Sequence, residues 1–241
     1  MARVVPQLLL LLGNESKALT PYIQWLTFRE VIKIDRINRQ KGIFVTFDSP
    51  NGVGKSSLLD GVANQLTQVG IDTLQTKEPT LSPLGQFVRG SEENFQGRIL
   101  ACLAAADRYF HLENEVLPAL QAGKIIFSDR YVESSLVLQR LDGLDVEFIW
   151  SLNNQIYIPD LSVILIASVE ILEQRLSQRS SLGRFERTKS RADELKYYLE
   201  AAEFLSKCGF NILLLDNSTT PLDQNVEKVV QKILKLNSHR E

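Results

Sequence analysis

A glycine-rich loop between an apolar run and an amphipathic segment constrains the fold of this chain more than any other feature. Residues 42–47 read GIFVTF, which is typical of a buried strand, and residues 48–55 read DSPNGVGK. Residues 56–70 have helical periodicity, with these apolar side chains on one face: Leu58, Leu59, Val62, Ala63 and Leu66. A strand, such a loop and a helix in this order are typical of a phosphate-binding loop, G-x-x-x-x-G-K-[ST]. The segment therefore predicts a protein that binds nucleotide phosphates, and the alternative is a plain glycine-rich turn.

The match to this pattern has one exception, at the first glycine. Ser49 stands there, and Pro50 after it has no backbone N–H to offer a phosphate. The later part of the loop, whose N–H groups build the phosphate cage, is intact. We expect Lys55 to contact the β- and γ-phosphates of ATP, and the Ser56 hydroxyl to bind Mg²⁺. The predicted ATP-binding residues are Asn51, Gly52, Val53, Gly54, Lys55, Ser56 and Ser57.

Short apolar runs alternate with helical stretches over the rest of the chain. The predicted strands cover residues 42–47, 71–76, 124–129, 160–167 and 210–216. The predicted helices cover residues 56–70, most of 92–123, and stretches near 145–155, 168–178, 187–207 and 221–235. This alternation favours an α/β fold of the P-loop NTPase class, with a doubly wound five-stranded parallel sheet flanked by helices and a short lid. The domain is predicted over residues 42–236, with its functional groups at the carboxyl ends of the strands.

Residues 1–41 differ in character from this domain. The apolar run VVPQLLLLLG is shorter than the roughly 20 residues that span a bilayer, and no A-x-A-like cleavage site follows it. Thr20 is a candidate helix N-cap, with Pro21 in the first turn. We expect an N-terminal extension that is either a helical arm, packed on the domain or on a second subunit, or a disordered segment.

Charge and cysteine content exclude several kinds of partner. The net charge of −2 gives no reason to expect binding to nucleic acid or to a membrane. The chain has two cysteines and two histidines, whose spacing forms neither a disulfide framework nor a metal site. Such low cysteine content fits a reducing compartment, and we expect a cytoplasmic protein.

Several short motifs follow the loop in a familiar order. They are TKEP at residues 76–79, ADRYFH at 106–111, SDRYVESS at 128–135, PDL at 159–161 and RFE at 184–186. Together with the phosphate-binding loop, these motifs closely resemble the thymidylate kinase family, over residues 43 to about 235. The resemblance implies transfer of phosphate from ATP to dTMP, dependence on Mg²⁺, and a homodimer. We expect an apolar helix near residues 133–155, which is a candidate for part of its interface.

The resemblance also implies roles for residues at the other strand ends. Asp129 ends a predicted strand, where a carboxylate can hold Mg²⁺ together with Ser56, and Arg130 next to it matches the arginine that grips the acceptor phosphate. Arg108 matches the arginine that contacts the acceptor base, although Asp107 and Arg108 also fit a surface ion pair on a helix. The predicted acceptor-binding residues are Asp48, Glu78, Pro79, Arg108, Arg130, Ser135 and Gln139.

The arginine-rich stretch over residues 178–191 resembles the lid of that family. A lid here brings Arg179, Arg184 or Arg187 to the transferring phosphoryl group, and we assign catalytic roles to Lys55, Arg130, Arg179 and Arg184. The alternative is a solvated basic turn.

The chain departs from the family pattern mainly on the acceptor side. Asn51 stands where the family usually has a carboxylate that touches the acceptor sugar, and Ala104 stands where many members have a Phe that stacks on thymine. Other departures are Lys77 for Arg, Leu138 for Tyr and Ile166 for Asp. These departures leave open a second interpretation, in which the acceptor is another nucleotide or a deoxynucleoside.

A monophosphate acceptor needs no general base, because its second pKa is about 6. A deoxynucleoside acceptor needs one, and Asp48 and Glu78 are the candidates. A third interpretation is a catalytically silent relative that binds nucleotide and acts through its N-terminal arm.

Overall fold

The computed structural model describes residues 41–178, 183–187 and 190–240. The extension predicted over residues 1–41, including the helix expected from Thr20, therefore lies outside the described residues apart from Lys41. Residues 41–241 form one compact unit.

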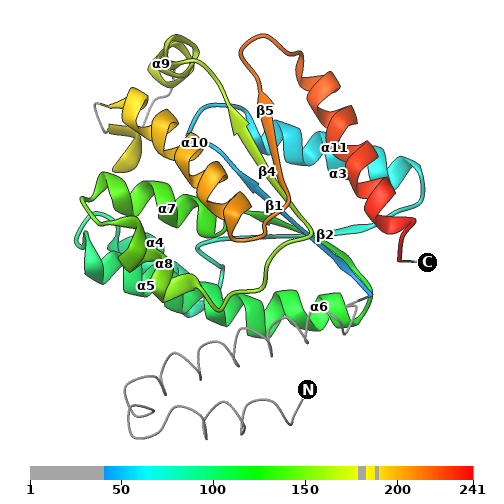
Figure 1. Cartoon of the computed structure of the whole chain (residues 1–241), viewed down its shortest axis with the longest axis horizontal. Helices are drawn as coiled ribbons and strands as arrows, with labels where there is room; N and C mark the ends of the chain where they lie inside the picture. The colour runs from blue at the N-terminus through cyan, green and yellow to red at the C-terminus, as the bar shows by residue number, and fades with distance from the viewer. Residues whose placement is uncertain (1–40, 179–182, 188–189, 241) are drawn as a thin grey trace, which may run out of the picture. The chain divides into compact units, whose positions relative to one another are not determined.

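A five-stranded, fully parallel sheet forms the centre of this unit (Figure 1). Its strands are β1 (Ile43–Asp48), β2 (Thr73–Lys77), β3 (Ile125–Asp129), β4 (Leu161–Ile166) and β5 (Ile212–Asp216). Their order in the sheet is β2-β3-β1-β4-β5, so the chain crosses over from one side of β1 to the other. The predicted doubly wound sheet is confirmed, and each predicted strand lies within a few residues of its observed position.

Helices cover both faces of the sheet (Figure 1). One face packs on α3 (Lys55–Gln68) and α11 (Leu222–Asn237). The other face packs on α6 (Leu117–Gln121), α7 (Val132–Leu141), α8 (Val146–Asn153) and α10 (Arg191–Lys207). The remaining elements are α4 (Pro83–Ser91), α5 (Arg98–His111), a π-helical turn (Leu112–Val116), α9 (Val169–Ser177) and a 3₁₀ turn (Phe185–Arg187).

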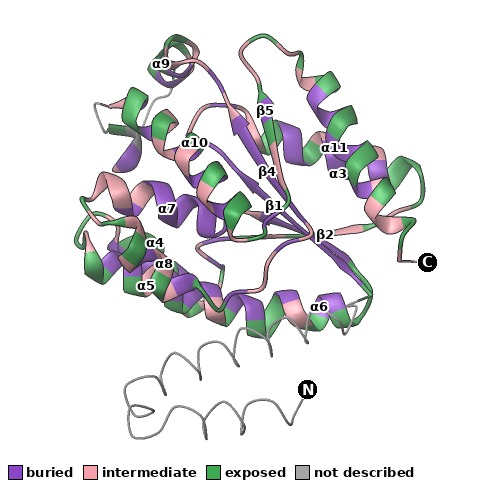
Figure 2. Cartoon of the chain, in the orientation of Figure 1, coloured by how far each residue is buried: buried purple, intermediate pink, exposed green. Residues whose placement is uncertain are grey.

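The side-chain alternation of β1 builds a core on each face. Val45 and Phe47 point to the layer of α3 and α11, whereas Phe44 points to the layer of α7 and α10. All three side chains are buried, and Figure 2 shows that burial concentrates along the central strands. Burial on both faces explains why this strand reads as a continuous apolar run.

Two helical regions differ from the sequence prediction. Helix α4 was not predicted, because the stretch from Thr80 to Ser91 contains a proline and two glycines. It forms because Pro83 occupies its first turn and the Ser82 hydroxyl accepts a hydrogen bond from the N–H of Gly85 at 3.0 Å.

The apolar stretch near residues 133–155 is two helices rather than one. A turn at Gly143, with φ of +86°, separates α7 from α8. Most of α7 is buried inside the domain, from Val132 to Val137 and at Gln139. The buried residues of α7 are therefore not available to a subunit interface, and the expected interface stays a prediction.

No helix in the described part of the chain is long and apolar enough to cross a membrane.

A buried carboxyl group, Glu133, joins α7 to the sheet. Its Oε1 accepts hydrogen bonds from the hydroxyl of Thr46 on β1, at 2.7 Å, and from that of Ser162 on β4. Its Oε2 is buried and has no hydrogen-bond partner in the part of the chain that the structure describes. Burial, and then the charge of nearby Asp48, raise the pKa of Glu133 to about 7. Glu133 is thus held mostly protonated below neutral pH.

This raised pKa predicts a pH-dependent difference between the wild type and Glu133→Gln. Between about pH 4.5 and pH 7, the folded state keeps a proton on Glu133, whereas the unfolded chain, with a carboxyl pKa of about 4.5, has released it. The stability of the wild type relative to the variant should fall from about pH 4.5 to about pH 7, by on the order of 2–3 kcal/mol, and stay constant above. Urea unfolding of both proteins at pH 5 and pH 8 measures this change. If the wild type and Glu133→Gln differed in free energy of unfolding by the same amount at pH 5 and at pH 8, the raised pKa would be contradicted.

Candidate active site

The loop between β1 and α3 has the backbone of a phosphate-binding site. Gly52 and Gly54 have φ angles of +87° and +107°, in the left-handed region that favours glycine. Ser49 has no such conformation; it is buried, and its hydroxyl lies 2.9 Å from the carbonyl oxygen of Pro50. The missing first glycine therefore leaves the cage of residues 52–57 free to form.

The buried carboxylate of Asp48 binds this loop to the neighbouring helices α7 and α10. It accepts hydrogen bonds from the N–H and hydroxyl of Ser134 at 2.8 and 2.9 Å, and from the N–H of Ser49 at 2.9 Å. The hydroxyl of Tyr198 on α10 lies 2.9 Å from the same carboxylate. Asp48 is 1% exposed, and its oxygens are occupied by protein donors. It positions the loop rather than facing the open pocket.

Lys55 and Asp129 meet at the carboxyl end of the sheet. The Lys55 ammonium forms an ion pair with the Asp129 carboxylate, because β1 and β3 are neighbours and Phe47 is in register with Asp129. Burial is the main cause that lowers the pKa of Lys55, with a further contribution from Arg130, while Asp129 opposes it. The hydroxyl of Ser56 and the carboxylate of Asp129 line one cavity. These oxygen donors fit Mg²⁺, which takes one or two protein ligands and completes its shell with phosphate and water.

Arg130 has an unusual backbone and three polar neighbours. Its φ of +76° is the one positive value among described residues other than glycine. The guanidinium donates to the amide oxygen of Asn51 at 2.7 Å and to the hydroxyl of Ser134 at 2.8 Å, and it lies 3.6 Å from the carboxylate of Asp48. This strained conformation directs the side chain between the phosphate-binding loop and the adjacent pocket.

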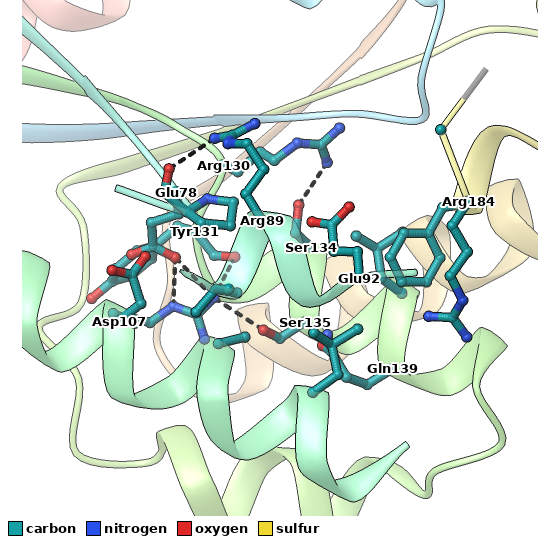
Figure 3. A pocket seen from close by; sticks show the side chains of 18 of the residues that line it. Glu78, Arg89, Glu92, Asp107, Arg130, Tyr131, Ser134, Ser135, Gln139 and Arg184 are labelled. Atoms are coloured by element: carbon teal, nitrogen blue, oxygen red, sulfur yellow. Dashed lines mark hydrogen bonds and ion pairs between the residues drawn. The ribbon is translucent and has the colours of Figure 1, made fainter. Parts of the chain in front are cut away.

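That pocket has a volume of about 280 Å³ and two chemically distinct groups of residues in its wall (Figure 3). Cationic side chains are Arg89, Arg108, Arg130 and Arg184, and aliphatic or phenyl ones are Val88, Leu100, Ala104, Leu138 and Phe185. Among the predicted acceptor-binding residues, Glu78, Pro79, Arg108, Arg130, Ser135 and Gln139 all line it. Asn51 lines both this pocket and the cavity of the phosphate-binding loop.

Arg108 is held by a set of buried contacts. Its guanidinium donates to Glu78 at 2.9 Å, to the carbonyl oxygen of Tyr131 at 3.0 Å, and to Ser135 at 3.0 Å. It also donates to Asn153 at 2.5 Å. Arg108 is 2% exposed, so the alternative of a surface ion pair is wrong.

Two further residues hold the loop that carries Glu78. The imidazole of His111 lies 3.1 Å from the second carboxylate oxygen of Glu78. Asp107 accepts hydrogen bonds from the N–H and the hydroxyl of Thr80, both at 2.7 Å. The motif ADRYFH thus positions the loop that carries Glu78 and Thr80 through the side chains of Asp107, Arg108 and His111.

The two described arginines of the predicted lid, Arg184 and Arg187, have different surroundings. Arg184 lines the pocket and pairs with Asp142 at the end of α7, with a distance of 3.1 Å between one pair of atoms. Arg187 is half exposed and forms an ion pair with Glu93 at 2.6 Å. Arg179 lies outside the described residues. The solvated basic turn therefore fits Arg187 better than Arg184.

Several residues around these cavities were not predicted. Arg89 and Glu92 come from α4 and its end, which the sequence did not identify as a helix. Arg175 and Asn217 each donate to the carbonyl oxygen of Val53, at 2.6 and 2.7 Å. They border a second cavity beside the phosphate-binding loop, together with residues 218–222. No local motif marks these positions, because they reach the loop from distant parts of the chain.

Comparisons with known proteins agree with this geometry. A sequence model of the thymidylate kinase family, described as "Thymidylate kinase", matches residues 47–232. A probable thymidylate kinase of Caldivirga maquilingensis is 38% identical over 149 residues, covering 60% of this chain and 73% of that protein. One of Thermococcus gammatolerans is 31% identical over 203 residues, covering 79% of this chain and 97% of that protein. The thymidylate kinase of Leuconostoc mesenteroides is 36% identical over 148 residues, covering 57% and 70%.

The buried contacts of Arg108 predict a large loss of stability when it is removed. Arg108→Leu leaves the carboxylate of Glu78 buried without its guanidinium partner, which should lower the free energy of unfolding by about 3–5 kcal/mol. Arg89→Leu, a more exposed arginine in the same pocket, should change it by less than about 1 kcal/mol. Urea denaturation of both variants checks this. Equal effects of the two substitutions would show that the Arg108 network does not stabilise the fold.

Proposed function

The chain belongs to the thymidylate kinase family, and we propose that it transfers the γ-phosphate of ATP to dTMP, which yields ADP and dTDP. The observation that carries this proposal is that Asn51 borders both the phosphate-binding loop and the adjacent pocket, with Arg130 donating to its side chain. A phosphate donor in the loop and a phosphate acceptor in the pocket therefore meet at these two residues. The names of the matched relatives support dTMP as the acceptor.

ATP binds with its phosphates in the cage of residues 52–57 and its base in the neighbouring cavity. The cage offers backbone N–H groups at the start of α3 and the charge of Lys55. The neighbouring cavity, with Arg175 and Asn217 in its wall, has the polar and apolar surface that a purine needs. Ser56 and Asp129 would hold Mg²⁺, which would supply neutralisation of the phosphate charge.

The acceptor lies in the pocket with its phosphate toward Arg130 and its base toward the apolar wall. Arg89 and Arg184 add positive charge at the phosphate end. The amide oxygen of Gln139 is buried and has no hydrogen-bond partner among the described residues, so it is available to the N3–H of thymine. Ala104 leaves this wall without the stacking ring of many relatives, and Leu100 and Leu138 supply apolar contact instead.

Catalysis in this arrangement is positioning and charge stabilisation. The acceptor phosphate is largely dianionic at neutral pH, because its second pKa is about 6, and it attacks without a general base. Lys55, Arg130 and Arg184 neutralise the charge that spreads over the transferring group. Arg179 is proposed as a second lid arginine that neutralises charge on the transferring group, and only the resemblance to the family supports this role.

The alternative acceptors are less well supported. A deoxynucleoside needs a base, but the oxygens of Asp48 and Glu78 are committed to protein donors. A catalytically silent relative has no need of the Lys55–Asp129 ion pair with the charge of Arg130 close enough to act on both groups.

We also propose a homodimer and a cytoplasmic location, the latter on the low cysteine content. Six of the exposed large apolar side chains fall between residues 74 and 110: Leu74, Leu81, Phe87, Phe95, Ile99 and Phe110. Ile99 and Phe110 lie on one face of α5, three helical turns apart. Exposed apolar surface of this kind marks association sites, and it replaces α7 as the proposed interface.

Substitution of Lys55 tests the proposed reaction. Lys55→Ala should lower kcat for dTMP by about 10³-fold or more, because the cation nearest the transferring phosphate is lost. The matched control is Lys207→Ala, which removes a surface lysine paired with Glu203 on α10 and should leave the rate unchanged. A coupled assay of ADP release, run with all the nucleoside monophosphates, measures both the rate and the acceptor preference. Turnover without preference for dTMP would contradict the proposed acceptor.

The proposed interface predicts a change of oligomeric state. Ile99→Asp should convert a dimer to a monomer, because it places a charge in an apolar contact. Leu199→Asp is the matched control, since Leu199 is an exposed leucine on α10, outside this surface. Sedimentation velocity of the full chain distinguishes the species. A wild-type monomer, or a dimer that survives Ile99→Asp, would refute this interface.

A further inference from the structure

Glu92 is a carboxylate in the acceptor pocket that has no hydrogen-bond or ion-pair partner among residues 41–178, 183–187 and 190–240. It follows the last turn of α4, one turn beyond Val88, and both residues line the pocket. Figure 3 shows the Glu92 side chain among the pocket residues, in the region of Ser134 and Arg184. Neither of its oxygens forms a hydrogen bond or an ion pair within 4 Å with a described residue.

The other two carboxylates of the pocket differ from Glu92 in this respect. Glu78 uses one oxygen for Arg108 and the other for His111. Asp107 uses both oxygens for Thr80. Of the carboxylates that line the described pocket, Glu92 is thus the one whose acceptor capacity is uncommitted.

Burying a carboxylate that has no hydrogen-bond partner costs free energy. Burial raises the pKa of Glu92, and the charges of Arg89, Arg130 and Arg184 oppose that rise. These arginines lie in the same pocket, but none of them forms a close pair with the Glu92 carboxylate. A carboxylate that lacks such a partner is a strong acceptor for an O–H or N–H group of a ligand.

The acceptor nucleotide has two such groups, the N3–H of the base and the 3′-hydroxyl of the sugar. The amide oxygen of Gln139, which has no hydrogen-bond partner among the described residues, can accept a hydrogen bond from the N3–H. Glu92 lies with the arginines that take the phosphate, and the sugar is next to the phosphate in any 5′-nucleotide. The amide oxygen of Asn51, also near the phosphate, is already occupied by Arg130.

We propose that the Glu92 carboxylate accepts the hydrogen bond of the acceptor's 3′-hydroxyl and so selects nucleotides that carry this group. The inference rests on the proposed function, because it assumes a 5′-monophosphate in this pocket. It makes Glu92 a specificity-determining residue that contacts the substrate but not the transferring phosphate.

The test compares dTMP with its 3′-deoxy analogue in the wild type, Glu92→Ala and Glu92→Gln. A charged hydrogen bond predicts that the wild type prefers dTMP in kcat/KM by on the order of 10- to 100-fold. In Glu92→Ala the preference should fall to about 3-fold or less, chiefly through KM, with an intermediate value for Glu92→Gln. Glu113→Gln, an exposed glutamate outside the pocket, is the control and should keep the wild-type preference.

N3-methyl-dTMP forms the second arm, because it removes the other donor. Glu92→Ala should leave discrimination against this analogue unchanged, and a loss of that discrimination instead would overturn the assignment to the 3′-hydroxyl. Calorimetric Kd values for dTMP and its 3′-deoxy analogue give the same ratio without turnover. Absence of turnover in the wild type counts against the proposed function. A Kd ratio that Glu92→Ala leaves unchanged counts against the role of Glu92.

Discussion

The buried carboxylate of Asp48 is the interaction on which the arrangement of the site depends. It ends β1 and accepts hydrogen bonds from the phosphate-binding loop, from the start of α7 and from Tyr198 on α10. A charge buried to this degree is tolerated only when several donors surround it, so the three elements are held in one geometry. Burial, and then the charge of Asp48, raise the pKa of the neighbouring Glu133 to about 7, so below neutral pH α7 packs against the sheet largely without a second buried anion.

This anchoring explains how parallel strands produce a site for two phosphates. Strands β1, β3 and β2 are neighbours and end at one edge, which places Asp48, Arg130 and Glu78 side by side. Arg130 bridges the loop and the pocket, and Arg108 holds the loop that carries Glu78. Because these side chains are already fixed by protein contacts, little ordering is needed when the nucleotides bind, and the binding energy is available for positioning.

The sequence was sufficient wherever the chemistry is local. The order of strand, loop and Lys55 identified the phosphate end, and the pair Asp129-Arg130 after an apolar run identified the adjacent strand end, both because adjacent residues share one structural position. The sequence was not sufficient where function depends on packing between distant segments. Glu92 lies at the end of α4, whose proline and glycines obscured its helical pattern in the sequence. Asn217 reaches the loop from the end of β5, which is two strands away from β1 in the sheet. Burial also decided between the two interpretations of Arg108, which periodicity alone left open.

Phosphorus NMR of a single reaction mixture tests the central claim most directly. The full chain, ATP, Mg²⁺ and dTMP are combined, and the resonances of all phosphate groups are followed with time. The account predicts that the signals of ADP and of the β-phosphate of dTDP grow together in equal amounts while those of ATP and dTMP decline. Loss of ATP to ADP and inorganic phosphate without dTDP would contradict it.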